Sequence, residues 1–178
     1  SWPICISPNQ SELFNNKGAV LHQLGNYQSA LEAYAIAIEL RITNQDAHYN
    51  MGRLLEETGK YEDARICYKK ALMLLPNYKE CLSKKGFLNT WMSDPDFGRK
   101  DTDRALILSP LMAEAHLHRG CSLLEEFDLD RATLSLRKAV LINPVQREGY
   151  ENLAIIGKQL VNDNLFHRAV KYISVLSK

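Results

Sequence analysis

Histidines and cysteines are the side chains of this sequence best suited to catalysis or metal binding. The cysteines are Cys5, Cys67, Cys81 and Cys121. No two of them form a CxxC pair, so their spacing gives little support for a metal site. His116 and His118 lie two positions apart, which directs them to different faces of a helix. No catalytic triad pattern or glycine-rich phosphate loop is recognisable. The sequence therefore predicts no catalytic residue, no metal and no cofactor.

Composition is typical of a globular protein. The 178 residues are 46% hydrophobic and 24% charged, with a formal net charge of +1. This charge gives no attraction to nucleic acids or membrane surfaces, and no apolar run reaches the length of about 18 residues that predicts a membrane span. The start, SWPICISPNQ, lacks the basic and apolar segments of a secretory signal. Scattered cysteines favour a reducing compartment, so we expect an intracellular, cytoplasmic protein.

A unit of 34 residues organises the chain, and residues 45–78 carry its most complete copy. Its fixed positions are Gly52, Leu55, Gly59, Tyr61, Ala64, Tyr68, Ala71 and Pro76. The first glycine recurs at the same phase as Gly18, Gly86 and Gly120. Self-similarity at a fixed period of this length predicts a stack of identical supersecondary units.

These residues resemble the tetratricopeptide repeat (TPR) family, closely over 11–146 and loosely over 147–178. The resemblance implies two antiparallel helices per repeat, a concave groove, and binding of other proteins rather than catalysis. We therefore expect an all-α fold, a right-handed superhelical array of about five helix-turn-helix repeats with ten helices. The expected repeats are 11–44, 45–78, 79–112, 113–146 and 147–178, of which the third and fifth diverge and the fifth is slightly longer. Residues 1–10 are either an extended lead-in or the end of a preceding repeat.

Local signals place the helix ends. Ser11 is the expected N-cap of the first helix, and glycines at 25 and 59 are expected to end first helices. Phe127 stands where the fourth repeat should have such a glycine. In the third repeat, Asp94 or Ser93 should cap a helix that has proline in its first turn. An interior glycine, Gly98, should weaken this helix, so we expect a less stable and more mobile unit.

The resemblance also implies which residues line the groove, because first helices face it in the family. One row of equal phase on these helices is Asn16, Asn50, Lys84, His118 and Asn152. An asparagine amide both donates and accepts, so such a row can pair with the backbone of an extended peptide, as related repeat proteins do. Alternatively, asparagine is simply soluble at exposed positions.

Phe87 and Trp91 lie one helical turn apart on the same face by phase, with Tyr49 and Arg53 on the neighbouring first helix. Aromatic residues and arginine dominate protein interfaces, so these four residues are candidates for partner binding. The alternative is that Trp91 fills space in the poorly patterned third repeat.

Two specialised functions fit less well. Receptors for chaperone tails need a lysine and an asparagine where this chain has Asn15 and Ala19, which argues against that role. RNA-reading repeats need phosphate contacts, whereas the groove side here is acidic. The acidic residues are Glu12, Asp46, Glu56, Glu57, Glu80, Glu114, Glu125, Glu148 and Glu151. They favour a basic segment of a partner.

The sequence thus predicts a non-enzymatic scaffold that holds an extended peptide or a helix of a partner protein in its groove. Two alternatives stay open. The chain is a structural subunit or fragment of a large multi-protein assembly, or it is the targeting part of a longer chain that carries an enzyme elsewhere.

Overall fold

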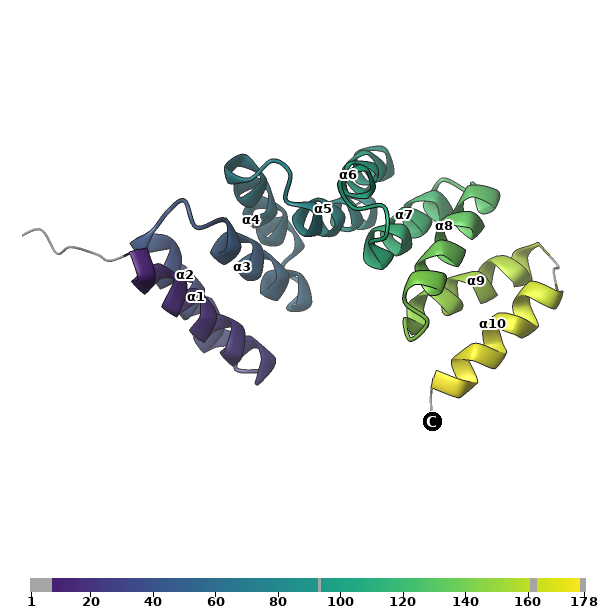
Figure 1. The fold of residues 1–178 in the computed structure, drawn as a ribbon, viewed down its shortest axis with the longest axis horizontal. Helices are drawn as coiled ribbons and strands as arrows, with labels where there is room; N and C mark the ends of the chain where they lie inside the picture. The colour runs from purple at the N-terminus through teal and green to yellow at the C-terminus, as the bar shows by residue number, and fades with distance from the viewer. Residues whose placement is uncertain (1–7, 93, 161–162, 177–178) are drawn as a thin grey trace, which may run out of the picture. The chain divides into compact units, whose positions relative to one another are not determined.

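Ten α-helices make up the fold of the described residues, and those residues contain no strand (Figure 1). The computed structural model describes residues 8–92, 94–160 and 163–176. The helices are α1 (Pro8–Gln23), α2 (Tyr27–Leu40), α3 (Gln45–Glu57), α4 (Tyr61–Leu74), α5 (Lys79–Trp91), α6 (Pro95–Leu108), α7 (Ala113–Glu125), α8 (Leu129–Ile142), α9 (Arg147–Gln159) and α10 (Asp163–Leu176). The predicted all-α fold of ten helices is confirmed.

The chain divides into two compact units, Ser1–Cys81 and Leu82–Lys178, and the division falls within α5. In the first unit, α1 packs against α2 and α3 against α4. In the second unit, α7 packs against α8 and α9 against α10, while α8 also contacts α9. Each unit therefore consists of helical hairpins whose second helix packs on the first helix of the next hairpin.

Residues in the left-handed conformation end three of the first helices. Gly25 has φ +76° after α1 and Gly59 has φ +77° after α3, so the predicted ends at these glycines are confirmed. Phe127 adopts φ +58° after α7, at the same phase of the repeat. The hairpin geometry is therefore kept without glycine, although a side chain in this conformation costs about 1–2 kcal/mol.

The start of α1 corrects the sequence prediction. The helix begins at Pro8, so Pro8–Gln10 belong to it, and Ser11 is not its N-cap. Proline is tolerated in a first turn, where its missing N–H has no helical partner. Ser11 is instead buried, and its hydroxyl donates to the Ala37 carbonyl at 2.7 Å. It accepts from the Asn44 amide at 2.8 Å, which ties α1 to the start of α3. The rest of the predicted lead-in, residues 1–7, lies outside the described part of the chain.

Glycine allows a large buried ring to lie against each first helix of the N-terminal unit. A Cβ at Gly18 would lie 2.6 Å from the Tyr34 ring, and one at Gly52 would lie 2.7 Å from the Tyr68 ring. Both rings are almost completely buried. The recurrence of glycine at this phase therefore has a steric reason in these two hairpins.

The α5–α6 hairpin uses a different solution, with small residues on both helices. A Cβ at Gly86 would lie 2.7 Å from the Gly98 carbonyl oxygen and 2.7 Å from Thr102. Gly98 is buried, and the backbone of α6 approaches α5 closely at this point. Helix propensity is therefore only part of the role of Gly98, because its missing side chain makes this packing possible.

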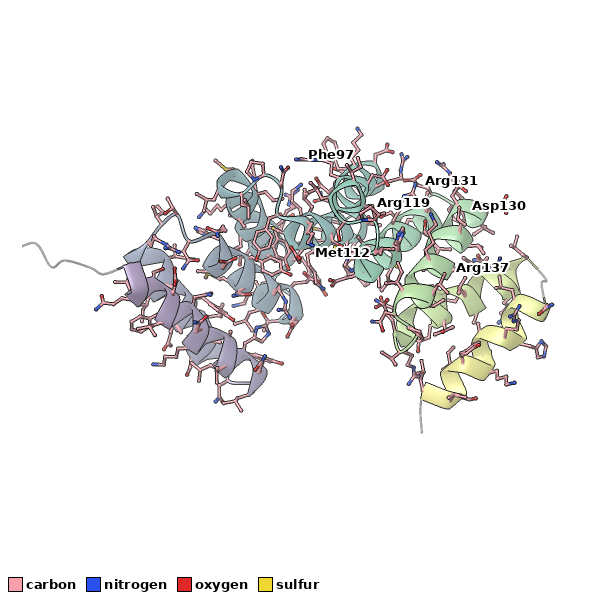
Figure 2. All side chains as sticks on the ribbon, in the orientation of Figure 1. Phe97, Met112, Arg119, Asp130, Arg131 and Arg137 are labelled. Atoms are coloured by element: carbon pink, nitrogen blue, oxygen red, sulfur yellow. The ribbon has the colours of Figure 1, made fainter. Side chains whose placement is uncertain are left out.

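The start of α6 follows the predicted capping pattern. Asp94 is the N-cap, its side chain accepts from the Phe97 amide at 3.4 Å, and Pro95 is the first helical residue. The alternative cap, Ser93, lies outside the described residues. Phe97 projects from the outer side of this helix and is 58% exposed (Figure 2).

Candidate functional site

A groove of about 570 Å³ runs over the first helices of the C-terminal unit. It is lined by Phe87, Thr90 and Trp91 of α5, Cys121, Leu124 and Glu125 of α7, and Glu148 and Asn152 of α9. Three of the residues predicted to bind a partner therefore line one surface. Its composition is aromatic on α5 and carboxylic on α7 and α9, which suits a ligand with both an apolar and a cationic part.

Trp91 is the most accessible large side chain of this groove, with 67% of its surface exposed. Phe87 precedes it by one turn, is half-buried, and stacks on the His118 ring with 4.6 Å between centroids. The His118 ring of α7 thus packs against Phe87 and helps to hold the aromatic side chains of α5 in place. The alternative that Trp91 fills the interior of the third repeat does not agree with its exposure.

His118 requires a correction, because its side chain is 4% exposed and cannot contact a partner in the groove. Its Nδ1 lies 2.8 Å from the Ser83 hydroxyl and 3.1 Å from the Ser83 carbonyl oxygen. Burial lowers the pKa of the His118 ring to about 4. The residue is therefore a neutral structural histidine between α5 and α7.

Acidification is expected to destabilise the fold through His118. The unfolded side chain has a pKa near 6.5 and the folded one about 4, so below pH 6.5 the unfolded state binds a proton that the folded state excludes. The free energy of unfolding should fall by about 2 kcal/mol between pH 7 and pH 5 from this residue alone. Urea denaturation of the intact protein and of His118→Gln at both pH values measures the effect. His48 and His116, whose pKa values burial also lowers, act equally in both proteins, so identical pH dependence would contradict the prediction.

Other predicted groove residues of this unit already have partners within the fold. Lys84 pairs with Glu114 at 2.9 Å, which links α5 to α7. The Asn152 amide donates to the Cys121 sulfur at 3.4 Å, which links α9 to α7. Burial raises the pKa of the Cys121 thiol to about 12, so it is protonated and a poor nucleophile. These contacts hold α5, α7 and α9 next to one another beneath the groove.

Carboxylates give the groove its charge. Glu125 and Glu148 line it, and both side chains are exposed. Partial desolvation raises the pKa of Glu148, an effect that nearby Lys84 opposes and nearby Glu151 reinforces. A cation bound next to Glu148 would lower the pKa of its carboxyl group again and stabilise the ionised form.

In the N-terminal unit the predicted partner-binding residues lie on α1 and α3. Asn16 is exposed, and the Asn50 amide donates to Asn15 at 3.0 Å across the two helices. Tyr49 packs on the Tyr78 ring, with 4.9 Å between centroids. Arg53 lies 3.8 Å from Glu57 one turn later.

Several acidic residues of this unit are also used internally. The Tyr68 hydroxyl donates to Glu56 at 2.5 Å, and the Tyr78 hydroxyl donates to Asp46 at 3.0 Å. The two carboxylates therefore satisfy tyrosines of the hairpin, and less of the predicted acidity is available to a partner than the sequence indicates.

Three groove residues were missed by the sequence analysis: Thr90, Cys121 and Leu124. Glu125 and Glu148 are among the acidic residues expected on the groove side. The signal that identifies Cys121 is the repeat period itself, because Cys121 lies 34 residues after Phe87.

Among the described residues, His, Cys, Asp and Glu side chains do not gather in threes as a metal site would require. No helix in the described segments has both the length and the apolar character needed to cross a bilayer.

Known proteins resemble the chain in sequence and in fold. Residues 9–77 match the family model described as tetratricopeptide repeat. Human protein O-mannosyl-transferase TMTC1 is 24% identical over 173 residues, which are 93% of this chain and 20% of that protein. The chain spans about a fifth of the length of the curated relatives it matches.

Two solved structures illustrate the shared fold. PilW, a widely conserved type IV pilus biogenesis factor, has a TM-score of 0.86 at 16% identity, covering 94% of this chain and 77% of PilW. YrrB, a TPR protein with an unusual peptide-binding site, has a TM-score of 0.69 at 20% identity, covering 92% of this chain and 84% of YrrB. TPR repeats are protein-interaction scaffolds. The family-model match covers α1–α4, and similar helical hairpins continue through α10, so the described residues have the fold of tetratricopeptide repeats.

Proposed function

We propose that this chain holds a segment of a partner protein, an extended peptide or a helix, against the first helices of its repeats. The groove of α5, α7 and α9 carries the proposal, because it joins an exposed tryptophan to two carboxylates in one surface of about 570 Å³. Such a volume holds one or two side chains rather than a folded domain. Holding a segment of a partner requires no catalytic residues, so we propose a non-enzymatic function for these repeats.

The chemistry of the groove specifies the kind of segment. Trp91 and Phe87 offer apolar area and a π face, on which an aliphatic or cationic side chain is stabilised. Glu125 and Glu148 add negative charge at the same surface. We therefore propose a segment that presents a basic residue next to an apolar one.

Residues of the N-terminal unit are proposed to contribute in a similar way. Asn50 uses one amide hydrogen on Asn15, which leaves its oxygen and its second hydrogen for a peptide backbone. Asn16, Tyr49 and Arg53 are accessible on the same two first helices. The thiols of Cys67 and Cys121 support the further proposal that the protein works in a reducing compartment.

Charge reversal tests the proposed groove. In a pull-down from cell extract, Glu125→Lys/Glu148→Lys should lose the proteins that the intact chain captures, because a basic segment would then meet like charge. The matched control is Glu39→Lys/Asp130→Lys, two exposed acids on second helices, which gives the same change in net charge. Circular dichroism confirms that all three proteins fold.

Retention of every specific protein by the groove variant would contradict the proposal. It would favour the alternative role, a structural subunit whose other faces contact neighbours in an assembly. Loss from the control as well would show that capture depends on total charge rather than on the groove.

A second candidate function follows from the size of the related proteins. The chain aligns with about a fifth of TMTC1, whose name describes a mannosyl-transferase. We propose, as the alternative, that these repeats are the interaction part of a longer chain with an enzyme elsewhere. The mass of the endogenous protein, measured with an antibody against these repeats and by mass spectrometry, decides this. A mass near 20.3 kDa would exclude it.

A further inference from the structure

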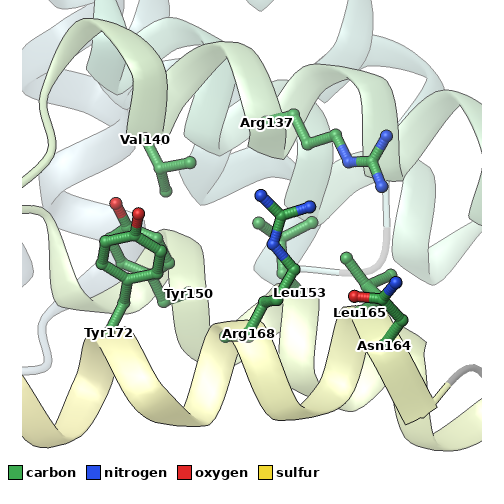
Figure 3. Close-up of a pocket in the computed structure, with 9 residues that line it drawn as sticks. Arg137, Val140, Tyr150, Leu153, Asn164, Leu165, Arg168 and Tyr172 are labelled. Atoms are coloured by element: carbon green, nitrogen blue, oxygen red, sulfur yellow. The ribbon is translucent and has the colours of Figure 1, made fainter.

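A second cavity, of about 400 Å³, opens between α8, α9 and α10 (Figure 3). It lies on the other side of α9 from the groove, because Tyr150 and Leu153 line it whereas Glu148 and Asn152 line the groove. No sequence pattern pointed to it, since its residues come from three helices at unrelated phases.

The walls of the cavity are aromatic and aliphatic. Tyr150 and Tyr172 stack with 5.0 Å between centroids and an interplanar angle of 17°, and they form one side. Leu153 lies at the back, and Val140 and Leu165 complete the apolar surface. Tyr172 is 51% exposed whereas Tyr150 is buried beneath it, so the Tyr172 ring is the one accessible to a ligand.

Two arginine side chains line the cavity next to the stacked tyrosines. Figure 3 shows Arg168 extending from α10 toward α8, and Arg137 extending from α8 over the same space. Elsewhere in this unit, arginines pair with carboxylates: Arg99, Arg119, Arg131 and Arg147 each have one within 3 Å. Among the side chains that the structure describes, neither Arg137 nor Arg168 has such a partner, although two like charges at one cavity repel each other.

An anion between the two guanidiniums relieves this repulsion. A phosphate monoester carries a charge of about −1.5 to −2 at pH 7 and three acceptor oxygens, whereas a carboxylate carries only about −1. The two arginines supply two positive charges and several forked donors, and Asn164 adds an amide at the same rim. The charge and the donors of the site therefore match a phosphate better than a carboxylate.

The apolar walls identify what carries the phosphate. In phosphoserine a single methylene joins the phosphate to the backbone, so a bound phosphoserine would leave the apolar walls uncovered. An aromatic ring between the backbone and the phosphate would cover these walls and pack on Tyr172. We infer that the cavity between α8, α9 and α10 binds a phosphotyrosyl side chain of a partner protein through Arg137 and Arg168.

This site shares no residue with the proposed groove, so either can fail without the other. Isothermal titration with the peptide acetyl-Ala-Ala-pTyr-Ala-Ala-amide tests the site in the intact chain. We expect binding at least about tenfold tighter than that of the same peptide with tyrosine, since each charge-assisted bond contributes about that factor. Phenyl phosphate should compete with the peptide, and benzoate should compete at least about tenfold more weakly.

Substitution of either arginine completes the test. Arg137→Gln and Arg168→Gln should each weaken binding of the phosphopeptide about tenfold or more. Arg131→Gln is the matched control on α8, because Arg131 pairs with Asp128 outside the cavity (Figure 2). Unchanged binding by both cavity variants, equal competition by benzoate, or tighter binding of adenosine monophosphate than of the phosphopeptide would each overturn the inference.

Discussion

Gly98→Ala is expected to lower the free energy of unfolding by about 3 kcal/mol, the upper end of the usual cost of overpacking. This sign is opposite to the one that helix propensity gives, since alanine is favoured over glycine in a helix interior by about 1 kcal/mol. The added Cβ would lie 2.2 Å from the Thr90 hydroxyl and 2.6 Å from the Gly86 carbonyl oxygen. A backbone oxygen cannot rotate away, so α5 and α6 would have to separate.

Urea denaturation followed by circular dichroism measures the effect. Ile107→Ala is the control on the same helix, because Ile107 is 79% exposed and its truncation should change stability by less than about 0.5 kcal/mol. Thr90→Ala combined with Gly98→Ala should recover only part of the loss, since the contact with Gly86 persists. An increase in stability for Gly98→Ala alone would contradict the close packing of this hairpin.

Trp91→Ala is expected to weaken binding of the groove partner about a hundredfold, which corresponds to about 3 kcal/mol. Trp91 is 67% exposed and borders both the Phe87 ring and the carboxylate side of the groove. A large aromatic side chain in a pocket of this kind is the usual centre of a binding surface, because it buries much area with little loss of conformational freedom.

The measurement is the dissociation constant of the purified partner segment, by fluorescence polarisation. Phe97→Ala is the matched control, since Phe97 is 58% exposed on α6 and does not line the groove. Trp91→Phe should retain part of the affinity. Equal affinity of Trp91→Ala and the intact chain would show that partners use another surface of the protein.

The sequence by itself determined the repeat and therefore the helices. The 34-residue period recurs in spite of variation at single positions, and each helix end has a local cause. Gly25 and Gly59 end α1 and α3 because they adopt the left-handed conformation, and Asp94 with Pro95 starts α6. Such signals depend on neighbouring residues in the chain, so no tertiary information is needed to find them.

The sequence also found part of the groove. Phe87, Trp91 and Asn152 line it because the helical and repeat phases place them on one face of the first helices. Phase alone could not separate exposed from buried members of that face. His118 belongs to the same row, yet it is buried against Ser83 and Phe87. Its burial depends on the distance between α5 and α7, which the side chains of both helices set together.

Only the tertiary structure decided the two features that depend on approach between helices. Gly98 lowers the helix propensity of α6, and its role in packing is recognised only when α5 lies against it. Arg137 and Arg168 are ordinary exposed arginines in the sequence, and they share a cavity because α8 and α10 both pack on α9. A local pattern specifies what each helix is, whereas the spacing between helices follows from all of their contacting side chains at once.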